Sequence, residues 1–129
     1  MPSVVRIVSG YDYGMAEQAT AEETTVASQR ERCCSAYHAA IELIGKRWTG
    51  AIVFVLLDGP LRFSEVKMLV PDLSDRLLSE RLKELESEGI VERRTSHDLP
   101  VRIEYSLTEK GRALEPAVRS LKVWARSWL

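Results

Sequence analysis

Apolar and polar positions follow helical spacing through the middle of the chain. The sequence predicts a helix over about residues 36–44, with Cys34 or Ser35 capping its start and Gly45 ending it. The positions expected to be buried on this helix are Tyr37, Ala40, Ile41 and Ile44. Residues 48–57 are apolar nearly all round, which predicts a second helix that is buried on most sides.

Two further helices are predicted, with a connection of about four residues between them. We expect Ser64 to cap the first of these helices, and Pro71 to end it within two turns. Ser74 is expected to cap the second helix, and Gly89 to close it. Its apolar face comprises Leu78, Leu82 and Leu85. Two short helices of this kind, the second one amphipathic, are typical of a helix-turn-helix.

The stretch after Gly89 has the spacing of strands. "IVERRT" and "VRIEYSL" are strand-like, and the loop "SHDLP" joins them into a hairpin. The positions that alternate with polar residues, as in a half-buried strand, are Val101, Ile103, Tyr105 and Leu107. Thr108 is expected to cap one last helix that runs to the end of the sequence. A hairpin directly after a helix-turn-helix is a wing, so the predicted fold is mainly α with a small β-hairpin wing (α+β).

The length of 129 residues fits one domain with a modest core. Residues 1–32 are polar and poor in large apolar groups, so we interpret them as a partly flexible N-terminal extension before a domain over residues 33–129. No apolar run approaches the roughly 20 residues that span a bilayer, and the first ten residues hold too short an apolar stretch for a secretory signal. We expect a cytoplasmic protein with no membrane partner.

The formal net charge of −1 and the pI of about 6.1 argue against bulk attraction to nucleic acid. Residues 60–102 hold one more acidic than basic side chain. Any DNA-binding surface must therefore come from the sorting of charges onto one face.

Three runs of the sequence carry a family resemblance. They are "IELIGKRWTGAIVFVLLDGPLRFSEV", "LSDRLLSERLKELESEGIVER" and "VRIEYSLTEKGRAL". Together they closely resemble the HxlR-type regulators, winged helix-turn-helix transcription factors related to the MarR group, over about residues 34–124. The resemblance implies a dimeric DNA-binding repressor or activator, but it implies no particular operon or ligand. We expect a sequence-specific regulator that acts as a homodimer, with repression the expected mode. Residues 1–32 lie outside it.

The exposed face of the helix expected from Ser74 suits a DNA major groove. Arg76 is a candidate for bidentate contact with guanine, and Ser79 is small enough to allow close approach. Glu80 could accept a hydrogen bond from cytosine, or could instead orient Arg76 or Lys83. Lys83 lies further along and is expected to meet phosphate. The alternative is an ordinary solvated face, but Glu80 and Glu84 are a like-charge pair that does not stabilise a helix.

The helix starts and the wing supply the other expected DNA contacts. Arg93 and Arg94 are neighbours on a strand and so point to opposite faces; one is expected to face DNA and the other to pair with an acid. His97 at the wing tip could meet phosphate or have no role. The full set of expected DNA-binding residues is Ser64, Ser74, Asp75, Arg76, Ser79, Glu80, Lys83, Arg93, Arg94, His97 and Arg102. The expected partner is a pseudo-palindromic duplex, read by recognition helices about 34–36 Å apart.

The last helix carries an apolar stripe that one small domain cannot easily cover. The most direct cover is a second copy of the chain, reached through the last and the first helices. The residues expected at this dimer interface are Tyr37, Ile41, Leu114, Val118, Leu121, Trp124 and Trp128. Packing is favoured over ligand stacking as the role of the tryptophans.

Cys34 and Cys33 are the remaining residues with reactive chemistry. Cys34 lies at the start of the first helix, where N–H dipoles favour a thiolate. Arg30 and Arg32 are close in sequence and are expected to help, whereas Glu31 opposes them. Adjacent Cα atoms, about 3.8 Å apart, are too close for an unstrained disulfide between the two. Some members of the family resembled sense oxidants or quinones through a cysteine at the place of Cys34, so a small oxidant or electrophile is an expected partner. Inert cysteines are the alternative.

Enzymatic chemistry has little support in the sequence. His38 and His97 lie on different elements, and no phosphate-binding glycine loop, carboxylate pair or metal-ligand spacing is present. A thiol oxidoreductase normally carries two residues between its cysteines. We therefore expect no cofactor, no metal and no catalytic residue. A winged helix that binds only protein remains the main alternative to a DNA-binding regulator.

Overall fold

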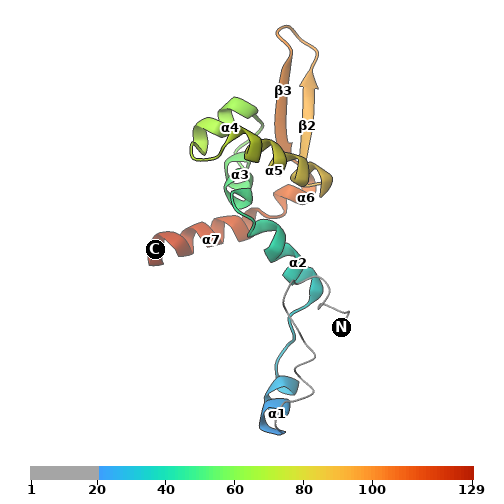
Figure 1. Ribbon diagram of the computed structural model, residues 1–129, viewed down its shortest axis with the longest axis vertical. Coiled ribbons are helices and arrows are strands. Elements are labelled where there is room, and N and C mark those ends of the chain that lie inside the picture. Colours follow the sequence, from blue (N-terminus) through green and yellow to red (C-terminus); the bar gives the residue numbers. More distant parts are fainter. Residues whose placement is uncertain (1–20) are drawn as a thin grey trace. The chain divides into compact units, whose positions relative to one another are not determined.

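A computed structural model describes residues 21–129 of the chain, with side chains from Thr25 onward. Most of the predicted extension over residues 1–32 lies outside the described residues, so that boundary stays a prediction. The described residues belong to two compact units, one ending at Gly45 and one running from Lys46 to Leu129 (Figure 1). The elements in chain order are α1 (Ala21–Gln29), α2 (Ser35–Ile44), α3 (Thr49–Leu56), β1 (Leu61–Arg62), α4 (Phe63–Leu69), α5 (Asp75–Ser87), β2 (Val91–Ser96), β3 (Arg102–Leu107), α6 (Glu109–Arg112) and α7 (Glu115–Trp128).

The first unit contains α1 and α2. Cys34 is the N-cap of α2, which decides between the two expected caps, and Gly45 follows the helix as predicted. The expected burial of α2 was wrong: Tyr37 is 62% exposed, Ile41 is 50% exposed, and no residue of the helix is buried. The spacing of apolar residues identifies a helix face suited to burial, but it does not indicate whether that face packs against the same chain or against another molecule.

The core of the second unit lies between α3, α4, α5 and the sheet. Its most deeply buried side chains are Thr49, Ile52, Val53, Leu56, Val66, Leu73, Leu78, Leu82 and Leu85. The predicted α3 is confirmed, and the left-handed backbone of Trp48 (φ 76°) precedes it. The leucine face of α5 is confirmed as well, because all three of its leucines are buried. This packing fixes α5 with its opposite face in solvent.

The two helices of the helix-turn-helix begin differently from each other. Ser74 caps α5 as predicted, and its Oγ accepts a hydrogen bond from the backbone N–H of Leu77 at 3.1 Å. The prediction that Ser64 caps α4 was wrong, since α4 begins at Phe63 and Arg62 is its N-cap. The backbone N–H of Arg62 donates to Glu65 Oε1 at 2.7 Å, so the capping group comes from the third residue of the helix.

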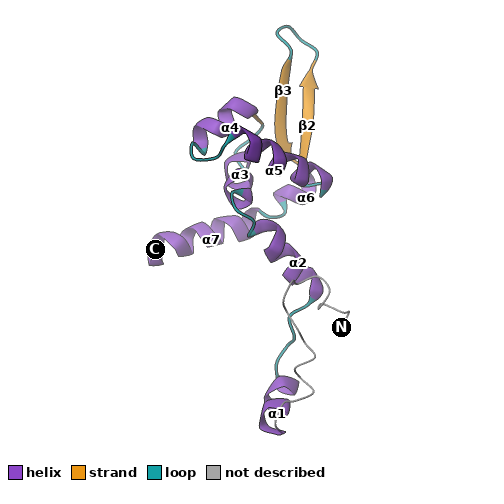
Figure 2. Ribbon diagram, in the orientation of Figure 1, coloured by secondary structure: helices purple, strands orange, loops and turns teal. Residues whose placement is uncertain are grey.

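The predicted hairpin is confirmed, and a third strand joins it. Strands β2 and β3 pair in antiparallel register, and the short β1 pairs with the other edge of β3, giving the order β1-β3-β2. The half-buried alternation holds only at the base of β3. Leu107 is 6% exposed, whereas Ile103 is 38% and Val101 is 60% exposed. The outer half of the hairpin projects beyond the helices of this unit, so no layer covers it (Figure 2).

The single last helix expected from the sequence is two helices. Thr108 caps α6 as predicted, through a hydrogen bond from the N–H of Gly111 to its Oγ1 at 3.1 Å. A separate helix, α7, starts at Glu115. Pro116 explains the break, because proline has no N–H for a bond to the carbonyl four residues earlier and its ring clashes there. At the second position of a new helix the same proline is tolerated.

Candidate DNA-binding surface and cysteine site

The exposed face of α5 presents the residues that the sequence singled out. Asp75, Arg76, Glu80 and Lys83 are exposed, and Ser79 is half-buried between them. The side chain of Arg76 is 91% exposed. Most of this face is therefore open to solvent at the end of the helix where side chains best reach base edges.

Two basic groups near this face are ion-paired with acids. Arg76 Nε lies 3.4 Å from Glu80 Oε1, one turn further along α5. Lys67 Nζ of α4 lies 3.4 Å from Asp75 Oδ1 and also donates to the carbonyl of Leu73. Of the roles considered for Glu80, orientation of Arg76 is the one that this geometry supports.

Lys67 was not among the residues singled out in the sequence. It links the two helices of the helix-turn-helix, because its ammonium group meets both the turn and the first residue of α5. The signal in the sequence was a basic residue on the first helix followed by an acidic residue, Asp75, at the start of the next. The spacing of charges within a single helix does not predict an ion pair between two different helices.

The wing separates the two neighbouring arginines as predicted. Arg94 Nη2 is 2.5 Å from Glu92 Oε1, two residues back on the same face of β2. Its cross-strand neighbour is Glu104, while Arg93 lies opposite Tyr105. Arg94 is thus the arginine with an acidic partner, as the sequence allowed for one of the two. His97 and Arg102 are exposed near the tip.

Arg62 lies between acidic residues of α4 and of the wing. Strand β1 places Arg62 opposite Glu104 of β3. The pKa of Glu65 lies below its usual value, first because the backbone N–H of Arg62 donates to it, with further lowering by the charges of Arg62 and Arg102. This edge of the domain consequently carries acids and bases in alternation, and not a continuous basic patch.

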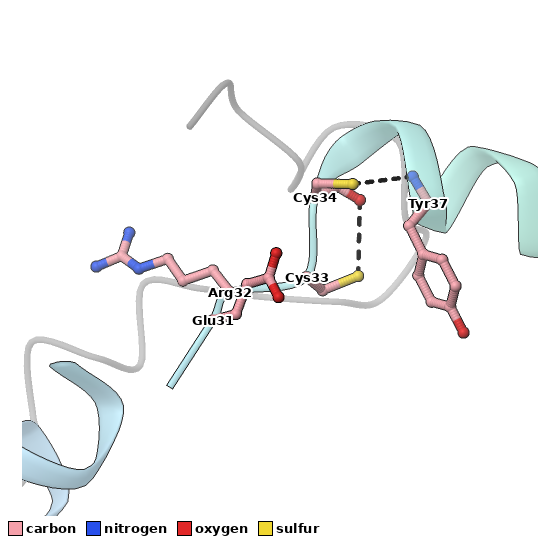
Figure 3. A pocket seen from close by; sticks show the side chains of 5 residues that line it. All are labelled: Glu31, Arg32, Cys33, Cys34 and Tyr37. Carbon is pink, nitrogen blue, oxygen red and sulfur yellow. Dashed lines mark hydrogen bonds between the residues drawn. The ribbon is translucent and has the colours of Figure 1, made fainter. Parts of the chain in front are cut away.

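Both cysteines are free and half-buried. Cys34 Sγ accepts a hydrogen bond from the backbone N–H of Tyr37 at 3.2 Å, so the sulfur itself caps α2. Cys33 Sγ lies 3.7 Å from the carbonyl oxygen of Cys34. Together with Glu31, Arg32 and Tyr37 they line a pocket, and the guanidinium of Arg32 points away from the sulfurs (Figure 3). The polar contact to the Cys34 sulfur is therefore made by a backbone N–H and not by the Arg32 side chain.

One face of α7 is apolar and exposed. Leu121 is 61% exposed, Trp124 is 52% and Trp128 is 75%. Leu114 and Val118, nearer the start of the predicted stripe, are half-buried. The helix is held to α3 on its other side, where Arg119 pairs with Asp58 and Lys122 Nζ lies 4.7 Å from the centroid of the Phe54 ring.

Among residues 21–129, no helix is long and apolar enough to cross a membrane.

Comparisons with known proteins identify the same helix-turn-helix that the structure shows. The HxlR-like helix-turn-helix family model matches residues 43–129. The Bacillus subtilis HTH-type transcriptional regulators YvaP and YodB are 51% and 47% identical, over 74% and 71% of this chain and 89% and 82% of theirs. The structure of reduced YodB has a TM-score of 0.69 and 44% identity, covering 75% of this chain and 95% of YodB.

A second solved relative is the redox regulator HypR. Its reduced form has a TM-score of 0.68 and 41% identity, covering 72% of this chain and 92% of HypR. YodB has also been solved after diamide treatment and with a bound quinone. The family match covers most of the chain, and the relatives are matched over most of their length. The chain belongs to the HxlR-like helix-turn-helix family of transcriptional regulators.

Proposed function

We propose that the protein binds a pseudo-palindromic DNA operator as a homodimer, acts by binding and not by catalysis, and works as a repressor in the cytoplasm. The observation that carries this proposal is the exposed start of α5, which offers Arg76, Ser79 and Lys83 from a helix whose other face is locked in the core. The recognition helix enters the major groove, and the wing lies along the flanking backbone.

The proposed dimer forms through α7 together with α2. In one copy of the chain, α7 leaves Leu121, Trp124 and Trp128 in solvent, and α2 leaves Tyr37 and Ile41 in solvent. Exposed apolar groups of this size on neighbouring turns favour burial against a partner. Two-fold symmetry then sets two copies of α5 one turn of DNA apart, which matches the symmetry of a palindrome.

Cys34 is the proposed sensor of an oxidant or electrophile. Its sulfur caps α2, one of the two helices proposed for the interface, so an adduct on it removes a cap and disturbs that helix. The relatives support this role: HypR is described as a redox regulator, and YodB has been solved with diamide and with quinone. Oxidation by diamide joins two thiols of different chains, or one thiol and a small thiol, while diamide accepts the two hydrogens.

The test is operator binding measured by band shift on DNA upstream of the protein's own gene. We expect a specific complex with wild type, and weaker binding after diamide or a quinone. Cys34→Ser is expected to bind the same DNA and to ignore both reagents, whereas Ser35→Ala, a neighbouring change without a thiol, responds like wild type. A wild type that binds no DNA overturns the proposal. A fully labelled wild type that binds unchanged overturns the sensor role alone.

A further inference from the structure

We propose that Cys33 and Cys34 form a two-thiol site that chelates a trivalent arsenical of the type RAs(OH)2. This goes beyond the proposed function, which uses Cys34 alone and gives Cys33 no part. The inference starts from the placement of the two sulfur atoms. Cys34 Sγ meets the N–H of Tyr37 at 3.2 Å, and Cys33 Sγ lies 3.7 Å from the Cys34 carbonyl oxygen. Both sulfurs therefore lie on the side of the backbone that faces Tyr37 (Figure 3).

The two thiols are accessible and share one pocket. Both are free and only half-buried, and both line the pocket with Glu31, Arg32 and Tyr37. Tyr37 is 62% exposed, so its ring can cover an apolar or aryl group carried by a bound reagent. Both cysteines are therefore open to a reagent that enters this pocket.

Direct coupling of the two sulfurs is disfavoured, but bridging them is not. The Cα atoms of adjacent residues are about 3.8 Å apart, below the roughly 4.4 Å at which disulfides begin. An arsenic atom placed between the sulfurs lengthens the bridge and removes this constraint. The two free thiols that line the pocket match the two sulfur ligands that a reagent RAs(OH)2 takes.

The chemistry balances without an oxidant. Each thiol displaces one hydroxyl group from arsenic, so two As–S bonds form and two As–O bonds break. The two thiol protons leave in two molecules of water, and arsenic stays trivalent. Binding to both sulfurs is a chelate, in which the second bond forms at the high effective concentration set by the first.

The experiment uses the full chain and phenylarsine oxide, which hydrates to the required RAs(OH)2. The protein is loaded with one equivalent, challenged with increasing mercaptoethanol, and weighed intact by denaturing mass spectrometry. We expect wild type and Ser35→Ala to keep one phenylarsenic group per single chain. Cys33→Ser and Cys34→Ser are expected to lose it at mercaptoethanol concentrations lower by about 100-fold, because each keeps only one As–S bond.

Two results overturn the proposal. One is equal retention by wild type and Cys33→Ser, which leaves Cys33 outside the site. The other is a mass of two chains joined by one arsenic, which assigns the second sulfur to another copy. Circular dichroism of each variant checks that loss of retention does not come from unfolding. No DNA enters this assay, so its outcome does not depend on operator binding.

Discussion

Arg76 and Glu80 lie one turn apart at the exposed start of α5, and Arg76 Nε is 3.4 Å from Glu80 Oε1. The arginine side chain is 91% exposed, so the pair is an ordinary surface ion pair worth about 0.2–1 kcal/mol. A bidentate contact between arginine and guanine is worth about 1–3 kcal/mol of discrimination. Glu80 can thus hold Arg76 in place in the free protein without preventing it from reading a base.

Replacement of Arg76 tests whether it reads a base. Arg76→Ala is expected to weaken specific binding by about 1–3 kcal/mol and to relax the preference at one base pair per half-site. Fluorescence anisotropy on the operator, on single-base variants and on random DNA measures both effects. Equal losses on specific and random DNA mean that Arg76 contacts phosphate instead.

Removal of the Glu80 charge tests its effect on non-specific binding. Glu80→Gln is expected to raise affinity for random DNA a few-fold, since it removes a negative charge beside the phosphates and frees Arg76. Glu88→Gln is the matched control, because it makes the same charge change at the far end of α5. Equal gains from the two variants, in anisotropy titrations at one salt concentration, assign the effect to net charge alone.

Polar substitutions on α7 test the proposed interface. Leu121→Asp combined with Trp128→Asp places two charges in the exposed apolar face, and both positions are exposed in one chain, so folding is expected to survive. We expect sedimentation velocity at micromolar concentration to show a monomer, and operator binding to fall with it, because one half-site gives too little affinity. Ser120→Asp, a single charge at an exposed position on the same helix, is expected to stay dimeric. A double variant that still dimerises places the interface elsewhere.

The sequence predicts the helix-turn-helix because its signals are local. Ser74 caps the helix that it precedes, and the leucines of α5 are buried at the spacing that marks them. The start of α4 was missed because Glu65 within the helix does the capping and Arg62 belongs to a strand that pairs with β3, a partner more than 40 residues away. A strand of only two residues, such as Leu61–Arg62, is too short to show the alternation of apolar and polar residues by which strands are predicted.

The candidate site was predictable as far as one chain determines it. The spacing on α5 identified Arg76 and its neighbours, but the pairing of Lys67 with Asp75 across the turn depends on how two helices meet. The expected burial of Tyr37 and Ile41 is not seen in one copy of the chain. The reason is different here, because the spacing of apolar residues indicates that a helix face is apolar but does not indicate which molecule covers it.

A substitution of Gly111 tests the packing of α6 against Ile90 and Leu107. A Cβ at this position lies 2.3 Å from the carbonyl oxygen of Ile90 and 3.1 Å from Leu107 Cδ2, so Gly111→Ala forces backbone to move. We expect a loss of about 1–3 kcal/mol in the free energy of unfolding, measured by urea denaturation. Ser120→Ala, at an exposed helix position, is expected to change it by less than about 0.5 kcal/mol. A Gly111→Ala variant as stable as wild type means that α6 and Ile90 are not in this contact.

Glu84 gives the domain a stability that depends on pH. Its carboxylate accepts a hydrogen bond from Lys46 Nζ at 2.9 Å and lies 3.3 Å from Arg81 Nη1. The pKa of Glu84 is lowered from 4.5 in the folded protein, mainly by the hydrogen bond from Lys46. Burial is the next largest effect and raises the pKa, and the charges of Lys46 and Arg81 lower it further. A lowered pKa means that the folded state binds the proton less readily than the unfolded state. The stabilisation is therefore complete above pH 4.5 and is lost as the pH falls through the lowered pKa.

Glu84→Gln is expected to be less stable than wild type at neutral pH, by less than about 1 kcal/mol because the side chain is 39% exposed and screened by water. The difference should shrink as the pH is lowered below 4.5, where wild type also loses the charge. Urea denaturation from about pH 3 to pH 7 measures the difference, and added salt should reduce it at neutral pH. Glu88→Gln serves as the matched control, because it makes the same change of side chain at the far end of α5. A Glu84→Gln difference that stays the same at acid pH means that the carboxylate stabilises the protein through packing and not through its charge.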